Sequence, residues 1–197
     1  MMNRHHFRNA LRKWTRTLHI YVSMLGLCAI LFFSATGFML NHEEWFGFDE
    51  PSVRTVEGML PAAILTGPDE LAVAESLRRD FHATGLVDSF ETYDDEIVVV
   101  FVSPGRRVQA TIARPDGETE VELESHGVAG RLVDLHRGGE TGAAWRFLID
   151  VTSVILVFAA LSGLLLWSFV PKWRTIGLGA AVFSLAICGV VYFLLVP

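Results

Sequence analysis

Cysteine is scarce in this chain of 197 residues, which holds only Cys28 and Cys188. Both lie inside long uncharged apolar runs, which excludes a disulfide framework for any domain outside the membrane and predicts small apolar packing instead. The chain also lacks a phosphate-binding loop and a serine or cysteine nucleophile with its partners. Its basic stretch is short and holds few aromatic residues, so nucleic acid is not an expected partner.

Charge is absent from three long segments, residues 20–40, 151–170 and 176–196. Each has 20 or 21 residues, and 21 residues of helix span about 32 Å, enough to cross a hydrocarbon core of about 30 Å. Backbone groups inside a bilayer must be satisfied within their own segment, so these segments are predicted to be helices. The lipid bilayer is therefore an expected partner of the chain.

Acidic residues are absent from both ends of the chain, since all 22 lie between Glu43 and Asp150. The first 19 residues carry five arginines and lysines, and Lys172 and Arg174 lie between the second and third segments. An excess of lysine and arginine marks the cytoplasmic side of a membrane. The sequence therefore predicts a cytoplasmic N-terminus, an external stretch over 43–150 and an external C-terminus. The first apolar run is too long for a cleaved signal peptide and is expected to be a signal anchor.

The external stretch is predicted to fold as an α+β domain over residues 43–135. Residues 69–83 have apolar residues at helical spacing after Asp69, which can cap the helix, whereas residues 43–68 hold many prolines and glycines and are predicted to be irregular. Four antiparallel strands are expected from the change to a period of two and from the turn residues between them, at 87–93, 96–103, 107–114 and 118–124. The helix is expected to cover one face of this small sheet.

The fold class that follows is an α-helical membrane protein with three transmembrane helices and an α+β insert. Glycine, alanine and serine in all three spans favour close helix packing, either within the chain or in a homo-oligomer or larger complex. The expected segments are a basic cytoplasmic tail at 1–19, spans at 20–40, 151–170 and 176–196, the external domain at 43–135, an interfacial connector at 136–150 and a cytoplasmic turn at 171–175.

Several short motifs resemble the PepSY-associated transmembrane family of bacterial inner-membrane proteins, in a short form with three spans. They are Leu18-His19, Thr36-Gly37, Asn41-His42, the run Leu135-His136-Arg137-Gly138 and the run from Leu161 to Trp167. The resemblance covers nearly the full chain and implies that the insert is a PepSY domain and that the membrane is the bacterial inner membrane. The larger relatives look like reductases that hold b-type haem by histidines at helix ends, whereas the soluble PepSY module is associated with protease regulation. This chain has fewer spans than those relatives and no flavin or nicotinamide motif.

The histidines at span ends are the candidate ligands of haem b. His19 and His42 cannot share one haem, because they are 23 residues apart, which corresponds to about 34 Å of helix. His42 and His136 are both expected at the outer face, where they can ligate one haem or another metal, with interfacial anchoring as the alternative. His19 is expected at the inner face, either as a ligand whose partner comes from elsewhere or as a side chain that extends to the interface.

Three hypotheses remain open for the function. The first is a haem protein that transfers electrons in the membrane, with a redox partner and with reduction of metal or siderophore as a context. The second is a non-enzymatic envelope module that binds a peptide, a protease or another partner protein through its sheet edge. The third is a structural subunit of a larger complex. The sequence does not decide whether the chain is an enzyme.

Overall fold

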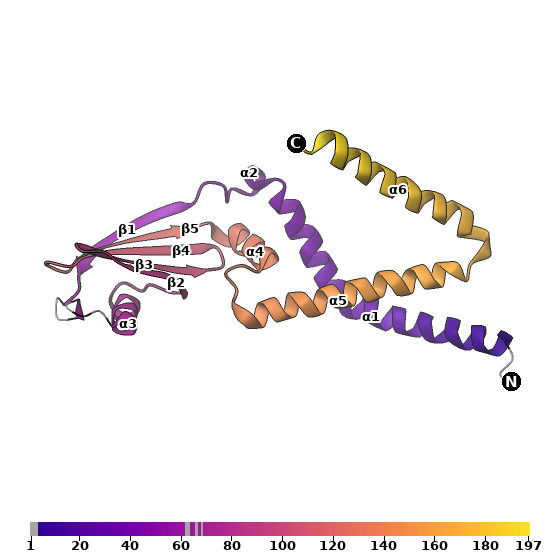
Figure 1. Ribbon diagram of the computed structural model, residues 1–197, viewed down its shortest axis with the longest axis horizontal. Coiled ribbons are helices and arrows are strands. Elements are labelled where there is room, and N and C mark those ends of the chain that lie inside the picture. Colours follow the sequence, from indigo (N-terminus) through magenta and orange to yellow (C-terminus); the bar gives the residue numbers. More distant parts are fainter. Residues whose placement is uncertain (1–3, 62–63, 66, 68) are drawn as a thin grey trace. The chain divides into compact units, whose positions relative to one another are not determined.

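Three long apolar helices dominate the computed structural model, which describes residues 4–61, 64–65, 67 and 69–197. They are α1 (Arg4–Leu40), α5 (Gly142–Ser168) and α6 (Arg174–Leu195) (Figure 1). Each is long and apolar enough to cross a membrane, and α6 has no buried residue, as a surface facing lipid requires. The three predicted spans are therefore present as helices, and the chain is a membrane protein.

Two of these helices extend beyond their apolar segments. The basic tail continues α1 back to Arg4, because its arginine, lysine, alanine and leucine residues favour helix. Helix α5 begins at Gly142, and a short helix α4 (Gly127–Arg137) precedes it, so much of the stretch expected as a connector is helical. The 3-10 turn η2 (Pro171–Trp173) separates α5 from α6.

A five-stranded antiparallel sheet forms the rest of the fold, with strand order β1-β5-β4-β3-β2. Its strands are β1 (Ser52–Met59), β2 (Leu86–Thr92), β3 (Glu96–Ser103), β4 (Arg106–Ala113) and β5 (Glu118–Ser125). Four strands match those predicted, but the prediction of an irregular stretch over 43–68 is wrong for β1. Prolines and glycines lie on both sides of β1, and most of its side chains are exposed, so its local strand pattern is weak. The strand forms because it pairs with β5, from Ser52↔Ser125 to Met59↔Glu118. The stretch also contains a one-turn helix, α2 (Glu43–Phe46).

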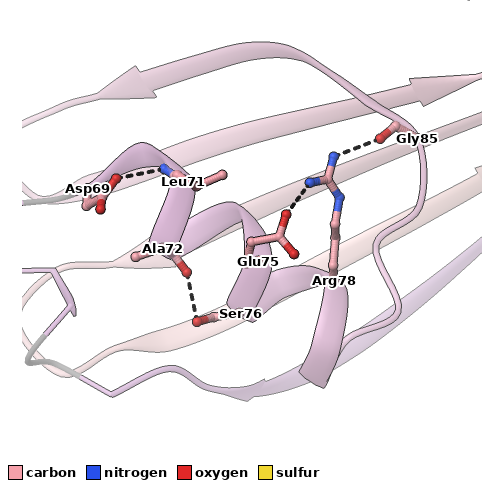
Figure 2. A network of polar contacts seen from close by, with 7 residues as sticks. All are labelled: Asp69, Leu71, Ala72, Glu75, Ser76, Arg78 and Gly85. Atoms are coloured by element: carbon pink, nitrogen blue, oxygen red, sulfur yellow. Dashed lines mark hydrogen bonds and ion pairs between the residues drawn. The ribbon is translucent and has the colours of Figure 1, made fainter.

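Helix α3 (Glu70–Asp80) covers one face of this sheet, as predicted (Figure 1). It begins where the carboxylate of Asp69 accepts a hydrogen bond of 3.1 Å from the backbone N–H of Leu71 (Figure 2). Its buried Val73 and Leu77 belong to the same apolar core as Phe101 of β3. The opposite face of β5 carries exposed glutamates, so the sheet has one apolar and one solvated face.

The side chain of Arg78 joins the end of α3 to the sheet. Its guanidinium donates to Glu75 at 2.6 Å and to the carbonyl of Gly85 at 3.0 Å (Figure 2). It also lies 5.3 Å from the ring centroid of Phe101, which adds a cation–π contact. These contacts hold the helix in register over the core, while its exposed ion pair with Glu75 adds little stability.

Helix α4 is attached to the β3–β4 hairpin through Gly105. Its φ of +72° suits glycine, and an added Cβ would lie 2.7 Å from the backbone nitrogen of Arg131 in α4. The N–H of Gly105 donates to the carboxylate of Asp134 at 2.7 Å. The close approach and the hydrogen bond fix α4 on the sheet, and α4 carries His136.

The chain divides into two compact units, residues 31–150 and residues 1–30 together with 151–197. The first holds the sheet, α4 and the last ten residues of α1. The second holds the rest of α1, most of α5 and the whole of α6.

Candidate functional site

His136 lies near the end of α4 against the second half of α1. Its Nδ1 is 2.7 Å from the hydroxyl oxygen of Thr36, within hydrogen-bond range. Its ring meets the ring of Phe33 edge to face, with centroids 5.1 Å apart. Gly37 completes the contact, because a Cβ at that position would lie only 3.4 Å from Cε1 of His136. The histidine therefore packs directly on the backbone of α1.

Two neighbouring features hold His136 in this position. Gly138, with φ of +71°, ends α4 in the left-handed conformation, and its N–H donates to the carbonyl of Asp134. The indole of Trp145 donates to the carbonyl of Leu135 at 2.7 Å and contacts Phe32 of α1 edge to face. The backbone on both sides of His136 is thus tied to the structure around it.

His19 occupies a comparable position in the other unit. Its Nδ1 is 2.8 Å from the hydroxyl oxygen of Ser162 on α5. A Cβ at Gly163 would lie 3.3 Å from Cε1 of His19, so this ring also rests on the backbone of another helix. An apolar cleft of about 250 Å³ adjoins the contact and is lined by Thr15, Leu18, Phe158, Leu161, Ser162 and Leu165.

His42 has different surroundings from the other two histidines. Its ring stacks on Trp45 at a centroid distance of 4.1 Å and lies 4.5 Å from the ring of Phe38. Two residues of α-helix correspond to a rotation of about 200°, so Phe38 and Thr36 lie on nearly opposite faces of α1. The structure therefore does not bring His42 and His136 together, and their shared ligation of one iron stays a prediction that requires His42 to leave Trp45.

A charged pocket of about 320 Å³ lies beside α4, on the face of the helix formed by Gly130, Val133, Asp134 and Arg137. Five carboxylates and three arginines line it, namely Glu43, Asp49, Glu124, Asp134, Glu140, Arg106, Arg107 and Arg137. Arg137 forms an ion pair of 3.3 Å with Glu43. Burial raises the pKa of the Glu140 carboxyl, and the carboxylates of Asp134 and Asp88 raise it further. The pocket is suited to small polar ligands.

A metal ion held by protein alone and haem need different numbers of side-chain ligands. Among the described residues, no three histidine, cysteine, aspartate or glutamate side chains gather to hold a metal, whereas structural zinc takes four such ligands. Haem iron already has four porphyrin nitrogens and needs only one or two ligands from the protein. In the hydrogen bonds of His136 and His19 the ring uses Nδ1, and neither Nε2 bonds to a described residue.

The hydroxyls of Thr36 and Ser162 are site residues that sequence reasoning did not identify. In the sequence they stand out only as small residues within the spans or as parts of the motifs that resemble the PepSY-associated family. A signal was available, since each hydroxyl precedes a glycine within an apolar span, in Thr36-Gly37 and Ser162-Gly163. The partner of each histidine could not be recognised from this signal, because the pairs are 100 and 143 residues apart.

Comparison with known protein families places the chain in one of them. The model of the PepSY_TM-like family matches residues 13–197, which is nearly the whole chain. No curated protein and no solved structure matches the chain significantly.

Proposed function

This chain belongs to the PepSY_TM-like family, and on that premise we propose that it binds b-type haem in the bacterial inner membrane and transfers electrons there. The observation that carries the proposal is the hydrogen bonding of two histidines, His136 near the end of α4 and His19 within α1. His136 and His19 each use Nδ1 for a hydrogen bond to another helix. Each therefore has Nε2 available for an axial bond, the usual arrangement of a histidine that ligates a metal.

Each residue of the two sites has a role in this proposal. The bound haem would supply one-electron oxidation and reduction. His136 and His19 would hold the haem iron, and His42 would be the candidate for a second residue that holds it at the site of His136. Gly37 and Gly163 leave the space that lets each imidazole lie on a helix backbone. The apolar cleft beside Ser162 offers a surface that excludes water from a porphyrin edge.

The orientation in the membrane follows from the basic residues. The proposal places the N-terminus and the turn that holds Lys172 and Arg174 in the cytoplasm, with the sheet domain in the periplasm. We expect alkaline phosphatase fused after Pro197 to be active and green fluorescent protein fused there to be dark. The same reporters fused after Lys172 are the control and should give the reverse pattern. Phosphatase activity after Lys172 but not after Pro197 would contradict the orientation.

The haem proposal is tested by a visible spectrum of the full chain, purified from membranes of cells supplied with a haem precursor. The expected result is a dithionite-reduced minus oxidised spectrum with sharp α and Soret bands, at about one haem per chain or more. A flat spectrum from intact, monodisperse protein would reject the proposal. The haem content measured by pyridine haemochrome serves as an independent check of stoichiometry.

A non-enzymatic binding module is the second candidate, and the sheet edges favour it. Strands β1 and β2 are the two outer strands of the sheet, and most side chains of β1 are exposed. An open strand edge can pair with an extended peptide of a partner protein. In this alternative the three helices only anchor the domain in the lipid bilayer. A flat haem spectrum would favour it.

A further inference from the structure

The hydroxyl of Thr36 is a hydrogen-bond donor to the backbone of its own helix. Its oxygen lies 2.7 Å from the carbonyl oxygen of Phe32, a separation at which two oxygens repel unless a hydrogen lies between them. A hydroxyl has one hydrogen, so the hydrogen of Thr36 is used in this bond. Toward Nδ1 of His136, at 2.7 Å, the oxygen of Thr36 can then only accept. The hydrogen of that bond therefore lies on Nδ1.

The hydrogen of the Ser162 hydroxyl, in the other unit, can be assigned in the same way. Its hydroxyl donates to the carbonyl of Ala159 at 3.0 Å, so its oxygen accepts from Nδ1 of His19 at 2.8 Å. In a neutral imidazole only one nitrogen carries a hydrogen. In their neutral forms, His136 and His19 thus both have a protonated Nδ1 and a lone pair on Nε2, the nitrogen that bonds to none of the described residues.

The two hydroxyls lie in apolar stretches of similar pattern. Aligning Thr36-Gly37 with Ser162-Gly163 also aligns two apolar stretches, residues 28–40 and 154–166, in which Phe32 matches Phe158 and Leu40 matches Leu166. A Leu-His pair precedes each stretch at a different spacing, with His19 17 residues before Thr36 and His136 26 residues before Ser162. The contacts are crossed, because the histidine of each copy bonds to the hydroxyl of the other.

From these observations we propose that the chain contains two copies of one histidine-docking unit, in which Thr36 and Ser162 are positioning residues that hold Nδ1–H and present the Nε2 lone pair. This proposal deepens the proposed function, because it identifies Nε2 as the nitrogen that would bind the haem iron. Only this assignment of Nε2 to iron rests on haem binding. The tautomers themselves are a property of the chain without haem. A glycine follows each hydroxyl, and an added Cβ there would lie 3.4 Å (Gly37) or 3.3 Å (Gly163) from Cε1 of the imidazole, so each ring lies close to the helix backbone.

The test is nitrogen-15 NMR of the haem-free full chain in lipid nanodiscs, with labelled histidine and the pH high enough to keep the rings neutral. Couplings between ring carbon protons and ring nitrogens show which nitrogen carries the hydrogen. We expect His19 and His136 both to have the hydrogen on Nδ1. In Thr36→Val, which keeps the shape but removes the acceptor, the tautomer ratio of His136 should shift toward Nε2–H by roughly three- to ten-fold, while His19 stays unchanged.

Matched variants separate positioning from a general loss of structure. Thr36→Ser keeps the hydroxyl and should restore the wild-type tautomer at His136. Ser162→Ala should shift only His19, and Ser162→Thr should restore it. The inference is overturned if either histidine has its hydrogen on Nε2 in the wild type, or if Thr36→Val and Ser162→Ala leave both ratios unchanged. Because no haem is present, a flat haem spectrum would reject the proposed function without affecting this result.

Discussion

Replacing His136 with alanine is expected to lower the haem bound per chain to about half or less, because the iron at that site loses its axial ligand. The measurement is the reduced minus oxidised spectrum of wild type and variant at equal protein concentration. Adding imidazole to His136→Gly should restore the lost bands, since the free ligand can fill the space of the missing ring. Rescue by imidazole distinguishes lost ligation from lost folding.

The control for this experiment is His82→Asn. His82 is exposed and has a φ of +55°, a backbone conformation that asparagine adopts more readily than alanine. Its haem content should equal that of the wild type. An unchanged spectrum in His136→Ala would show that His136 is not a ligand, and a loss of haem in His82→Asn would show that the assay reports folding instead.

His42→Ala tests whether the two outer histidines share one iron. Shared ligation requires the ring of His42 to leave its stacking position on Trp45. If it does so, the haem spectrum of the variant should differ from that of the wild type. A spectrum identical to that of the wild type would reject His42 as a ligand and leave His136 to bind without it.

Replacing Phe101 with alanine is expected to destabilise the sheet domain by about 3–5 kcal/mol. Phe101 is fully buried, with 0% of its surface exposed, and it packs with Val73 and Leu77 of α3 in the core. The truncation removes apolar contacts and leaves a cavity, and it also removes the ring over which Arg78 lies. A small domain has only about 5–15 kcal/mol of stability in total, so most of it would be lost.

Hydrogen exchange of the full chain in detergent measures this effect. Amides of β3 and β4 should exchange faster by roughly two to three orders of magnitude, at about 1.4 kcal/mol for each factor of ten. Phe46→Ala is the matched control, because Phe46 is 41% exposed and its loss should change exchange of β3 very little. Equal protection in Phe101→Ala and wild type would show that this residue does not support the core.

Local sequence patterns were sufficient where one element depends mainly on its own residues. The three spans follow from uncharged length, and α3 follows from its cap at Asp69 and its apolar spacing. Strands β3, β4 and β5 follow from alternation and from turns that contain Gly105 and Gly117, both of which have positive φ. In each case the periodicity or the turn residue indicates the structure without reference to distant parts of the chain.

Strand β1 and the two histidine sites depend on partners far along the chain. Residues 52–59 carry a weak strand pattern and become a strand because β5 supplies their hydrogen bonds. The sequence singled out these histidines as candidates but not the residue that each ring contacts, and shared ligation of one iron by His42 and His136 stays a prediction. Side-chain direction around a helix changes by about 100° per residue, so positions close in sequence can face opposite sides.

The amino-acid sequence alone determined that this is a membrane protein with three apolar helices and an α+β domain, because the absence of charge over 20 residues and the period of the insert are local properties. Only the tertiary structure decided that Thr36 and Ser162 hold His136 and His19. The physical reason is that a hydrogen bond between helices depends on how two helices pack, and neither helix contains that information by itself.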